Sequence, residues 1–438
     1  MSKPKMSHNN TLPRSARSLA SLWIPLALGG MLLAAGKVPF DAYSSGDDSG
    51  TGEARWWRGN THTHTLWSDG DAPPNLVAKR YREAGYDFLV LSDHNILSQG
   101  ERWFPVTAGG RLTPARLAAL KSELGQDIIT TRVRTEDGVE IEELLLPTLA
   151  ETRALFEQPD EFMMIEGEEI TDGFDGRPVH VNGINLTEKI APQGGESYLD
   201  TVQRNFDAVA EQGARLGRPT LAHLNHPNFQ WAVRGSEDFM SLKGEAFVEI
   251  YNGHPSTREA GDEDHQSIVD FWDEVNVGRG IIGQPLALGF ATDDSHHHHE
   301  VAPARASMQR GWVMVRSESL EANAIVNAMR RGDFYGSSGV TLSDLSFTGN
   351  SLTVDIDTEE GVTYETTFTG AVKDADGSWQ VKTLGTTTAD PAVFNASGDE
   401  LFVRATVTSS RNHPRPQNDP PGAKEVESAW TQPVQPTR

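Results

Sequence analysis

Short apolar runs that alternate with helix-like stretches are the feature of this chain that most restricts its fold. Each run ends in polar residues, as the buried strands of a parallel sheet do. Residues 75–84 fit a helix that Gly85 ends, and residues 86–91 (YDFLVL) fit the strand that follows it. Five more runs have this character, namely residues 162–166, 220–224, 246–251, 285–291 and 312–315. Their spacing predicts an α/β barrel built from repeated strand and helix units.

The chain departs from this rhythm in two places. Residues 99–160 contain a helical stretch at 114–124 and an acidic stretch, and we interpret them as an insertion over one mouth of the barrel. After about residue 341 the pattern changes to alternating strands, such as residues 352–357, which is typical of a small antiparallel β domain. We therefore predict a barrel at residues 54–340, followed by a β domain and tail at residues 341–438.

The first 40 residues differ in charge from the rest of the chain. They carry five basic residues and no acidic residue, whereas the whole chain has 62 acidic and 38 basic residues and a net charge of −24. An uncharged apolar stretch separates Arg17 from Lys37 and ends in small residues, which is typical of an export signal. We predict a cleaved signal peptide at residues 1–40, a linker at residues 41–53, and a periplasmic or secreted protein. Retention as a membrane anchor is the alternative, because the stretch approaches the roughly 20 residues that span a bilayer.

The composition excludes several classes of function. An acidic chain argues against extended nucleic-acid binding, because phosphate backbones are held chiefly by Lys and Arg. The sequence contains no cysteine, which excludes disulfides, thiolate metal sites and thiol nucleophiles. Any metal ion must therefore be bound by nitrogen and oxygen atoms.

Histidine and carboxylate side chains gather where the predicted strands end. In an α/β barrel the C-terminal ends of the strands meet at one mouth, so residues far apart in the sequence become neighbours. His62 and His64 are two positions apart and point to the same side of an extended strand, as do Asp294 and His296. Nine residues are candidate metal ligands on this ground: His62, His64, Asp69, His94, Glu169, His180, His226, Asp294 and His296.

Nine donors exceed the need of a single ion. A divalent cation takes about four to six ligands, so nine side chains with a bridging carboxylate and water supply two or three divalent metal ions. Nitrogen and oxygen donors suit Zn, Mn or Fe. Residues 297–299, which extend a run of four histidines, are expected to be exposed.

Further residues receive roles in catalysis or substrate binding. His223 and His254 are candidates for donating a proton to the leaving group, with a supporting or surface role as the alternative for each. Asn252 and Arg310 are predicted to contact the substrate. Arg310, together with the arginines at residues 330–331, is a candidate for holding an anionic group of the substrate, with surface charge as the alternative.

Several motifs extend the pattern over roughly residues 53–434, namely RGNTHTHTLWSDGD, HLNHPNF, EIYNGHP, RRGDFYGSSGV and AWTQPV. With the nine candidate ligands, they resemble the PHP (polymerase and histidinol phosphatase) metallohydrolases, and the nearest branch resembles the carbaryl-hydrolase-like exported proteins. The resemblance implies a distorted (β/α)7 TIM-like barrel that holds two or three metal ions. It implies hydrolysis of phosphate esters in most relatives, and cleavage of carboxylic esters or carbamates in the nearer branch.

The resemblance also implies how the ligands divide among the ions. His62 and His64 would hold one ion with Glu169 and Asp294, Glu169 would bridge to a second ion held by His180 and His226, and Asp69, His94 and His296 would hold a third. Asp69 stands where many relatives have histidine, which bears on the third ion. His223 is the alternative to His226.

We therefore expect a metal-dependent hydrolase that uses a metal-activated water, with a phosphoester favoured as its small-molecule substrate. Hydrolysis of carboxylic esters, carbamates or amides is the alternative. A non-catalytic binding module, in which metal serves structure or ligand capture, is the second alternative.

Overall fold

The computed structural model describes residues 53–229, 236–300, 302, 304–415 and 425–437. The predicted signal peptide and all but the last residue of the predicted linker lie outside the described residues. The described residues belong to one compact unit. In this part of the chain, no helix is long and apolar enough to cross a lipid bilayer.

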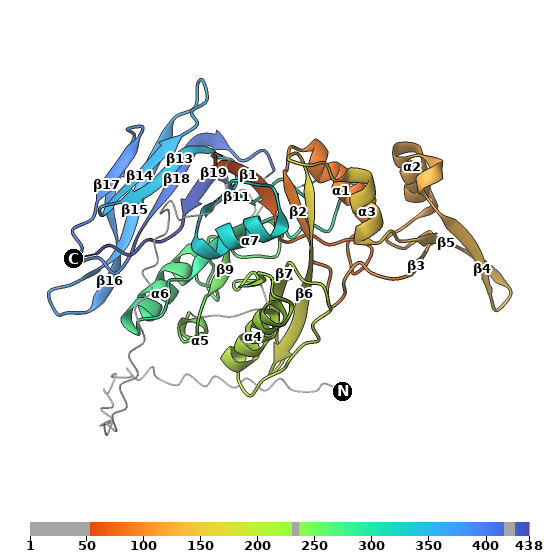
Figure 1. Cartoon of the computed structure of the whole chain (residues 1–438), viewed down its shortest axis with the longest axis horizontal. Helices are drawn as coiled ribbons and strands as arrows, with labels where there is room; N and C mark the ends of the chain where they lie inside the picture. Colours follow the sequence, from red (N-terminus) through yellow and green to blue (C-terminus); the bar gives the residue numbers. More distant parts are fainter. Residues whose placement is uncertain (1–52, 230–235, 301, 303, 416–424, 438) are drawn as a thin grey trace, which may run out of the picture. The chain divides into compact units, whose positions relative to one another are not determined.

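A mixed sheet of 13 strands forms the body of the structure (Figure 1). Seven strands lead to or carry residues of the candidate site: β1 (Arg55–Asn60), β2 (Phe88–Leu91), β6 (Met163–Phe174), β7 (Arg177–Ile184), β8 (Leu221–Leu224), β9 (Phe247–Asn252) and β10 (Leu288–Thr292). Six more complete it: β11 (Trp312–Ser317), β12 (Phe334–Ser337), β15 (Tyr364–Lys373), β16 (Trp379–Thr387), β18 (Val403–Asn412) and β19 (Val426–Thr431). The strand order is β10-β9-β8-β7-β6-β2-β1-β11-β12-β19-β18-β15-β16.

The directions of the strands differ from those of the predicted (β/α)7 barrel. Strands β1, β2 and β6 are parallel, as are β8, β9 and β10, but β7 runs antiparallel between β6 and β8. The β6 and β7 strands form a hairpin whose turn contains Asp175 and Gly176, both with positive φ, as short hairpin turns require. From β11 onward each neighbouring pair is antiparallel. The α/β class is therefore confirmed in a mixed rather than a uniformly parallel form.

The predicted closed barrel is not found, because β10 and β16 are edge strands of an open sheet. A single parallel bridge between Thr63 and Ser295 joins the segments that follow β1 and β10. The Gln432 side chain covers part of the β10 edge, where it accepts from the Gly289 amide at 2.7 Å and donates to its carbonyl at 2.9 Å. Apolar runs in a sequence reveal where strands lie, but they do not reveal direction or closure.

Helices pack against the first part of the sheet (Figure 1). They are α1 (Pro74–Glu83), α4 (Tyr198–Leu216), α5 (Glu237–Met240), α6 (Ile268–Ile281) and α7 (Ala322–Arg331). The longest, α4, lies on β7 and β8, and its Val202, Phe206 and Val209 share a buried apolar cluster with Ala222 and Leu224. The predicted helix at residues 75–84 matches α1 within one residue at each end.

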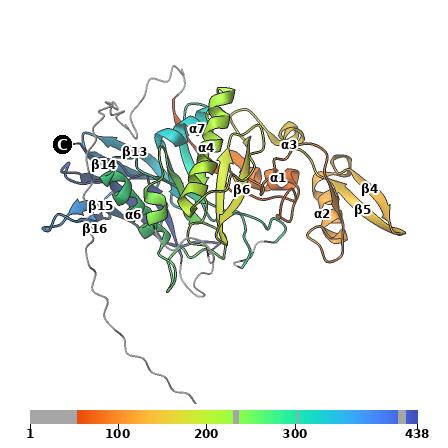
Figure 2. The same cartoon turned by 90° about the horizontal axis from the view of Figure 1, so that it is seen from below.

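The predicted insertion contains a small sheet and two α-helices. Its elements are β3 (Trp103–Pro105), α2 (Pro114–Leu124), a 3-10 turn (Gln126–Ile128), β4 (Thr131–Glu136), β5 (Val139–Leu145) and α3 (Leu149–Phe156). Both views show α2 and this sheet beside α1 and α3 (Figures 1 and 2). Leu117 and Leu120 of α2 join Leu76 and Tyr81 of α1 in one buried apolar cluster.

The C-terminal residues add a three-stranded sheet, β13 (Leu342–Thr348), β14 (Ser351–Ile356) and β17 (Ala392–Asn395). The strand predicted at residues 352–357 matches β14 closely. The main sheet also continues here, because β19 pairs with both β12 and β18. Strands from before and after residue 341 thus share one sheet, and the domain boundary at that residue stays a prediction.

Candidate metal centre

The nine candidate ligands meet at the ends of the central strands. They form four overlapping groups whose ligand atoms lie within 4.8 Å of one another: His64, Asp69, His94 and His296; His62, His64 and Asp294; His62, Glu169 and His226; His94, Glu169 and His180. Most follow a strand, but Glu169 lies within β6 and His180 lies within the antiparallel β7. The structure therefore brings together all nine residues. The β6–β7 hairpin takes the place of one helical crossover of the predicted barrel.

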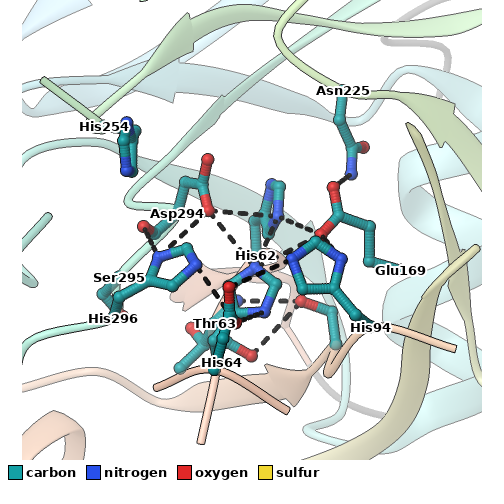
Figure 3. A network of polar contacts seen from close by, with 12 residues as sticks. His62, Thr63, His64, His94, Glu169, Asn225, His254, Asp294, Ser295 and His296 are labelled. Atoms are coloured by element: carbon teal, nitrogen blue, oxygen red, sulfur yellow. Dashed lines mark hydrogen bonds and ion pairs between the residues drawn. The ribbon is translucent and has the colours of Figure 1, made fainter. Parts of the chain in front are cut away.

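Nitrogen atoms of His62 and His64 and an oxygen of Asp294 form one of these groups, and an oxygen of Glu169 approaches the same two nitrogens (Figure 3). The Nε2 atoms of His62 and His64 are 3.1 Å apart, and both lie 3.3 Å from Asp294 Oδ1. Glu169 Oε2 lies 3.5 Å from His62 Nε2 and 3.4 Å from His64 Nε2. Around a tetrahedral ion with bonds of about 2.0–2.2 Å, neighbouring ligand atoms are about 3.3–3.5 Å apart. These side chains therefore fit a small divalent cation.

Glu169 connects this group with the next two. Its Oε1 lies 2.9 Å from His180 Nδ1 and 3.4 Å from His226 Nε2, and its Oε2 lies 2.9 Å from His94 Nδ1. Among the described residues, buried Oε2 has no hydrogen bond of acceptable geometry, although three imidazole nitrogens approach it. A buried anionic oxygen without a donor is costly, and a cation between it and the imidazoles removes that cost. Glu169 is thus placed as a bridging ligand.

The remaining group faces solvent. Asp69, whose side chain is 51% exposed, lies 3.3–3.5 Å from nitrogens of His64, His94 and His296. His94 takes part in two groups, since its Nε2 faces Asp69 and its Nδ1 faces Glu169. The rings of His64 and His296 are stacked at 4.1 Å between centroids. A ligand that enters from solvent reaches this group first.

The buried carboxylates give the centre a strong affinity for positive charge. Burial by itself would raise the pKa values of Glu169 and Asp294, but nearby imidazolium charges hold both well below the ordinary range. Burial would likewise lower the pKa of His62, yet the charges of Asp294, Glu249 and Glu169 raise it well above its usual value. Burial lowers the pKa of His64 to about 3, so its nitrogens remain free of an added proton. Divalent cations bound here would neutralise the negative charge of the Glu169 and Asp294 carboxylates in place of the protons on the neighbouring imidazoles.

Glu249 is a residue of the centre to which the sequence assigned no role. It is fully buried, and its Oε1 accepts from His62 Nδ1 at 2.7 Å while its Oε2 accepts from the His226 amide at 2.7 Å. Because the proton of neutral His62 then lies on Nδ1, the Nε2 lone pair points to the group that His62 forms with His64 and Asp294. The signal in the sequence was a lone acidic residue within an otherwise apolar strand, β9.

Asp93 and Asn225 support the ligands in a similar way. Asp93 Oδ1 accepts from the amides of Thr65 at 2.8 Å and Ser68 at 3.0 Å, which fixes the loop that carries Asp69. The side-chain amide of Asn225 donates through Nδ2 to Glu169 Oε1 at 2.9 Å. Both residues follow a predicted strand directly, beside a candidate ligand in the sequence.

Backbone strain also concentrates at the ligands. His226 has φ of 26° and Asp294 has φ of 47°, which side-chain-bearing residues rarely adopt. Each of these conformations costs about 1–3 kcal/mol and persists only where the surroundings enforce it. The Glu249 carboxylate, which accepts from the His226 amide, supplies part of that constraint.

The two predicted proton donors occupy different environments. His223 is fully buried, stacks on Phe290 at 4.9 Å, and has no hydrogen-bond partner for either ring nitrogen among the described residues. His226, rather than His223, lies in the ligand groups. His254 lies beside Asp294 and its ring is 5.5 Å from that of His296 (Figure 3). The Ser256 amide donates to His254 Nδ1 at 3.1 Å and burial lowers the His254 pKa to about 4, so a neutral ring carries its proton on Nε2.

Asn252 and Arg310, the two residues predicted to contact the substrate, form hydrogen bonds with other residues of the protein. Asn252 donates to Glu249 at 2.8 Å and to Asp294 at 3.2 Å, so it positions these carboxylates. Buried Arg310 donates to the carbonyls of Gly253 at 2.6 Å and Ala302 at 3.1 Å. Their substrate roles stay predictions.

Other sequence-based expectations about charged residues also meet different surroundings. Arg330 pairs with Glu245 at 2.9 Å and Arg331 with Asp333 at 3.0 Å. His298, expected to be exposed, is buried, and its Nε2 contacts the His64 carbonyl at 3.0 Å. This expectation was wrong because the loop after β10 folds back over the loop after β1.

Comparisons with known proteins give distant similarities. No known family model matches the chain. The chain is 25% identical over 142 residues to the 1-deoxy-D-xylulose 5-phosphate reductoisomerases of Cupriavidus taiwanensis and Cupriavidus necator, and the match covers 30% of this chain. It spans 36% of the length of each of these relatives, which gives no ground for assigning their reaction.

Solved structures align over more of the chain. A two-domain protein from Bacteroides vulgatus that contains a predicted PHP-like metal-dependent phosphoesterase aligns with 87% of this chain and 96% of its own, at 12% identity and a TM-score of 0.37. An amidohydrolase from Chromobacterium violaceum aligns with 55% of this chain and 87% of its own, at 13% identity and a TM-score of 0.28. Because both TM-scores lie below 0.5, we draw the function from the geometry of the ligand groups.

Proposed function

We propose that this protein is a metal-dependent hydrolase of the PHP type, with phosphate esters as its preferred substrates. The observation that carries the proposal is the group of His62, His64 and Asp294, whose ligand atoms lie 3.1–3.3 Å apart as around a small divalent cation, with Glu169 Oε2 at 3.4–3.5 Å from the same two nitrogens. The bridging position of Glu169 supports at least two ions, and the group around Asp69 supports a third.

The residues of this chain would hold the ions and prepare the reaction. Divalent ions bound here would lower the pKa of a water molecule and stabilise the negative charge that develops on the substrate. Glu249 orients His62. Glu169 joins the ligands His62 and His64 to the ligands His180 and His226, so that ions held by the two sets would face one substrate. His254 lies beside Asp294 as a neutral ring with its hydrogen on Nε2, so it would donate a hydrogen bond to the leaving-group oxygen, and the proton released by the attacking water would neutralise that oxygen. No protein nucleophile is needed for this reaction.

A purified, metal-stripped sample reloaded with Mn or Zn tests the proposal. We expect release of nitrophenol from 4-nitrophenyl phosphate, loss of this activity with chelator, and no activity in His64→Ala with a wild-type far-ultraviolet circular dichroism spectrum. Turnover of 4-nitrophenyl acetate alone would replace the phosphoesterase assignment by the esterase, carbamate or amide alternative. Stoichiometric metal without turnover of any of these substrates would support the non-catalytic binding module.

Export is a separate proposal that rests on the sequence of residues 1–40. N-terminal sequencing of the mature protein distinguishes a cleaved signal peptide from a retained anchor. A start after residue 34 to 40 supports cleavage, and an intact N-terminus supports the anchor.

A further inference from the structure

A cavity of about 550 Å³ opens beside the metal centre. Its walls come from three segments: the loop after β1 with Asp69 and Asp71, residues between Phe104 and Arg116 of the insertion, and His296, His297 and Arg305 after β10. Asp69 and His296 line the cavity together with three arginines, Arg111, Arg116 and Arg305. The cavity therefore connects the solvent-facing ligand group with a cluster of positive charge.

One of the three arginines is balanced within the protein. Arg116 lies 3.2 Å from Asp71 Oδ2, and its guanidinium also donates to the Arg111 carbonyl at 2.6 Å. Asp69, the other carboxylate of the wall, is turned to the imidazoles of the metal centre. Asp69 and Asp71 thus make their closest contacts with groups other than Arg111 and Arg305, although both also attract the Arg111 charge from a greater distance.

Arg111 and Arg305 have fewer close partners of opposite charge than Arg116. Arg111 donates to the Gly70 carbonyl at 2.9 Å and lies 5.0 Å from the ring centroid of Phe104, and it has no carboxylate within 4.0 Å among the described residues. Arg305 has a single ion pair, with Glu300 at 3.8 Å, in which both side chains are about half exposed. In a chain of net charge −24, arginines with so few carboxylate groups in close contact are unusual. A guanidinium presents its donors in a fork that matches carboxylate and phosphate oxygens.

We propose that the substrate carries a second anionic group, a carboxylate or a phosphate, which Arg111 and Arg305 bind while the scissile ester lies at the metal centre. This inference rests on the proposed hydrolase function and names its substrate class. The cavity volume admits a group about the size of an aromatic ring between the two anions. The insertion thereby selects substrates, and its residues are positioning and specificity residues rather than catalytic ones.

The test uses two probes that the metal centre cannot hydrolyse. Phenylphosphonate has one anionic group, and 3-carboxyphenylphosphonate has the same group with a second anion across the ring. We expect the Zn-loaded protein to bind the carboxylated probe at least tenfold more tightly in isothermal titration calorimetry. Arg111→Ala should remove this preference, because the hydrogen bonds that it loses are those to the charged carboxylate of the second probe. The affinity for phenylphosphonate, which lacks that carboxylate, should stay within about twofold.

Two further variants guard against trivial explanations. Arg305→Ala, at a half-exposed side chain, should reduce the preference without affecting folding. Arg215→Ala, which breaks an exposed pair with Glu188, should leave both affinities unchanged. Equal binding of the two probes by the wild-type protein, or an equal loss for both probes in Arg111→Ala, overturns the inference.

Turnover of 4-nitrophenyl phosphate and 4-nitrophenyl acetate by the same samples separates this inference from the proposed function. Activity without a preference for the carboxylated probe removes the anionic subsite alone. A preference without turnover removes the hydrolase assignment and leaves the subsite. Loss of both results removes both.

Discussion

Replacing Glu249 by glutamine removes one charge and changes almost nothing in size. The four donors around this carboxylate are His62 Nδ1 and Thr292 Oγ1 at Oε1, and the His226 amide and Asn252 Nδ2 at Oε2, all within 2.7–2.8 Å. The charge and hydrogen bond of His62 hold the pKa of Glu249 below its ordinary range against the effect of burial, so the side chain is ionised at neutral pH. A glutamine replaces one of the two accepting oxygens by an NH2 group. The two hydrogen-bond donors that contacted that oxygen then face another donor.

The magnitude follows from the bond to His62. A hydrogen bond to a charged group contributes about 1.5–3 kcal/mol, and without it the His62 ring is free to rotate its Nε2 away from His64. At about 1.4 kcal/mol per factor of ten, metal affinity should fall by about 10-fold to 150-fold. Loss of an outer partner of a metal-bound histidine has effects of this size in other proteins.

A competition titration of Zn against a chromophoric chelator measures this change. Glu211→Gln, at an exposed position of α4, is the matched control and should keep the wild-type affinity. The melting temperature of the metal-free variant shows how much of the effect is structural. An unchanged Zn affinity with a lowered melting temperature would refute the reasoning, because Glu249 would then stabilise the fold without orienting a ligand.

Three other predictions concern stability. Burial lowers the pKa of His94, but the Glu169 charge outweighs it and raises this pKa from 6.5 to about 11, so its stabilising contribution is complete below pH 6.5 and is lost as the pH rises through about 11. Thermal melting of metal-free protein should show this decline, and His94→Gln should flatten it; an equal slope in both proteins contradicts the prediction. Arg279→Met should lower the free energy of unfolding in urea by about 1–3 kcal/mol, since the buried Leu242 carbonyl loses its donor while water can reach the Pro285 and Gly244 carbonyls. Asp93→Asn should lower it by about 1–3 kcal/mol and weaken Zn binding through the Asp69 loop, and a wild-type affinity would show that the loop holds without it.

The elements of the fold were predictable where a local pattern defines them. The helix at residues 114–124 has the same bounds in the structure, because Pro114 follows a Thr113 side chain that caps the first turn and Gly125 follows the last. The strand at residues 162–166 was found but extends to Phe174, since Gly167, Glu168 and Glu169 interrupt the apolar run that marked it. The direction of β7 depends on the turn at residues 175–176 and on pairing with β6 and β8, which apolar runs do not record.

The candidate ligands were predictable because their chemistry is unusual at strand ends. A His, Asp or Glu at the end of a buried apolar run, or within one as His180 is, requires a partner for its polar group, and nine such residues favour metal ions over nine separate hydrogen bonds. The supporting Glu249 and the arginines of the cavity carry no comparable signal. An acid in a strand and arginines in an insertion are common in proteins, and only their neighbours give them a role.

The sequence alone determined which donor atoms this protein owns, since the lack of cysteine and the placement of histidines and carboxylates are properties of the chain. Only the tertiary structure decided which nitrogen of each ring faces the shared space, that Glu169 touches three groups, and that Arg111 comes to lie on the same cavity as Asp69. The physical reason is range. Strand and helix patterns arise from neighbours along the chain, whereas the ligand groups bring atoms of residues up to more than 200 positions apart in the sequence, such as His64 and His296, within 4.8 Å of one another.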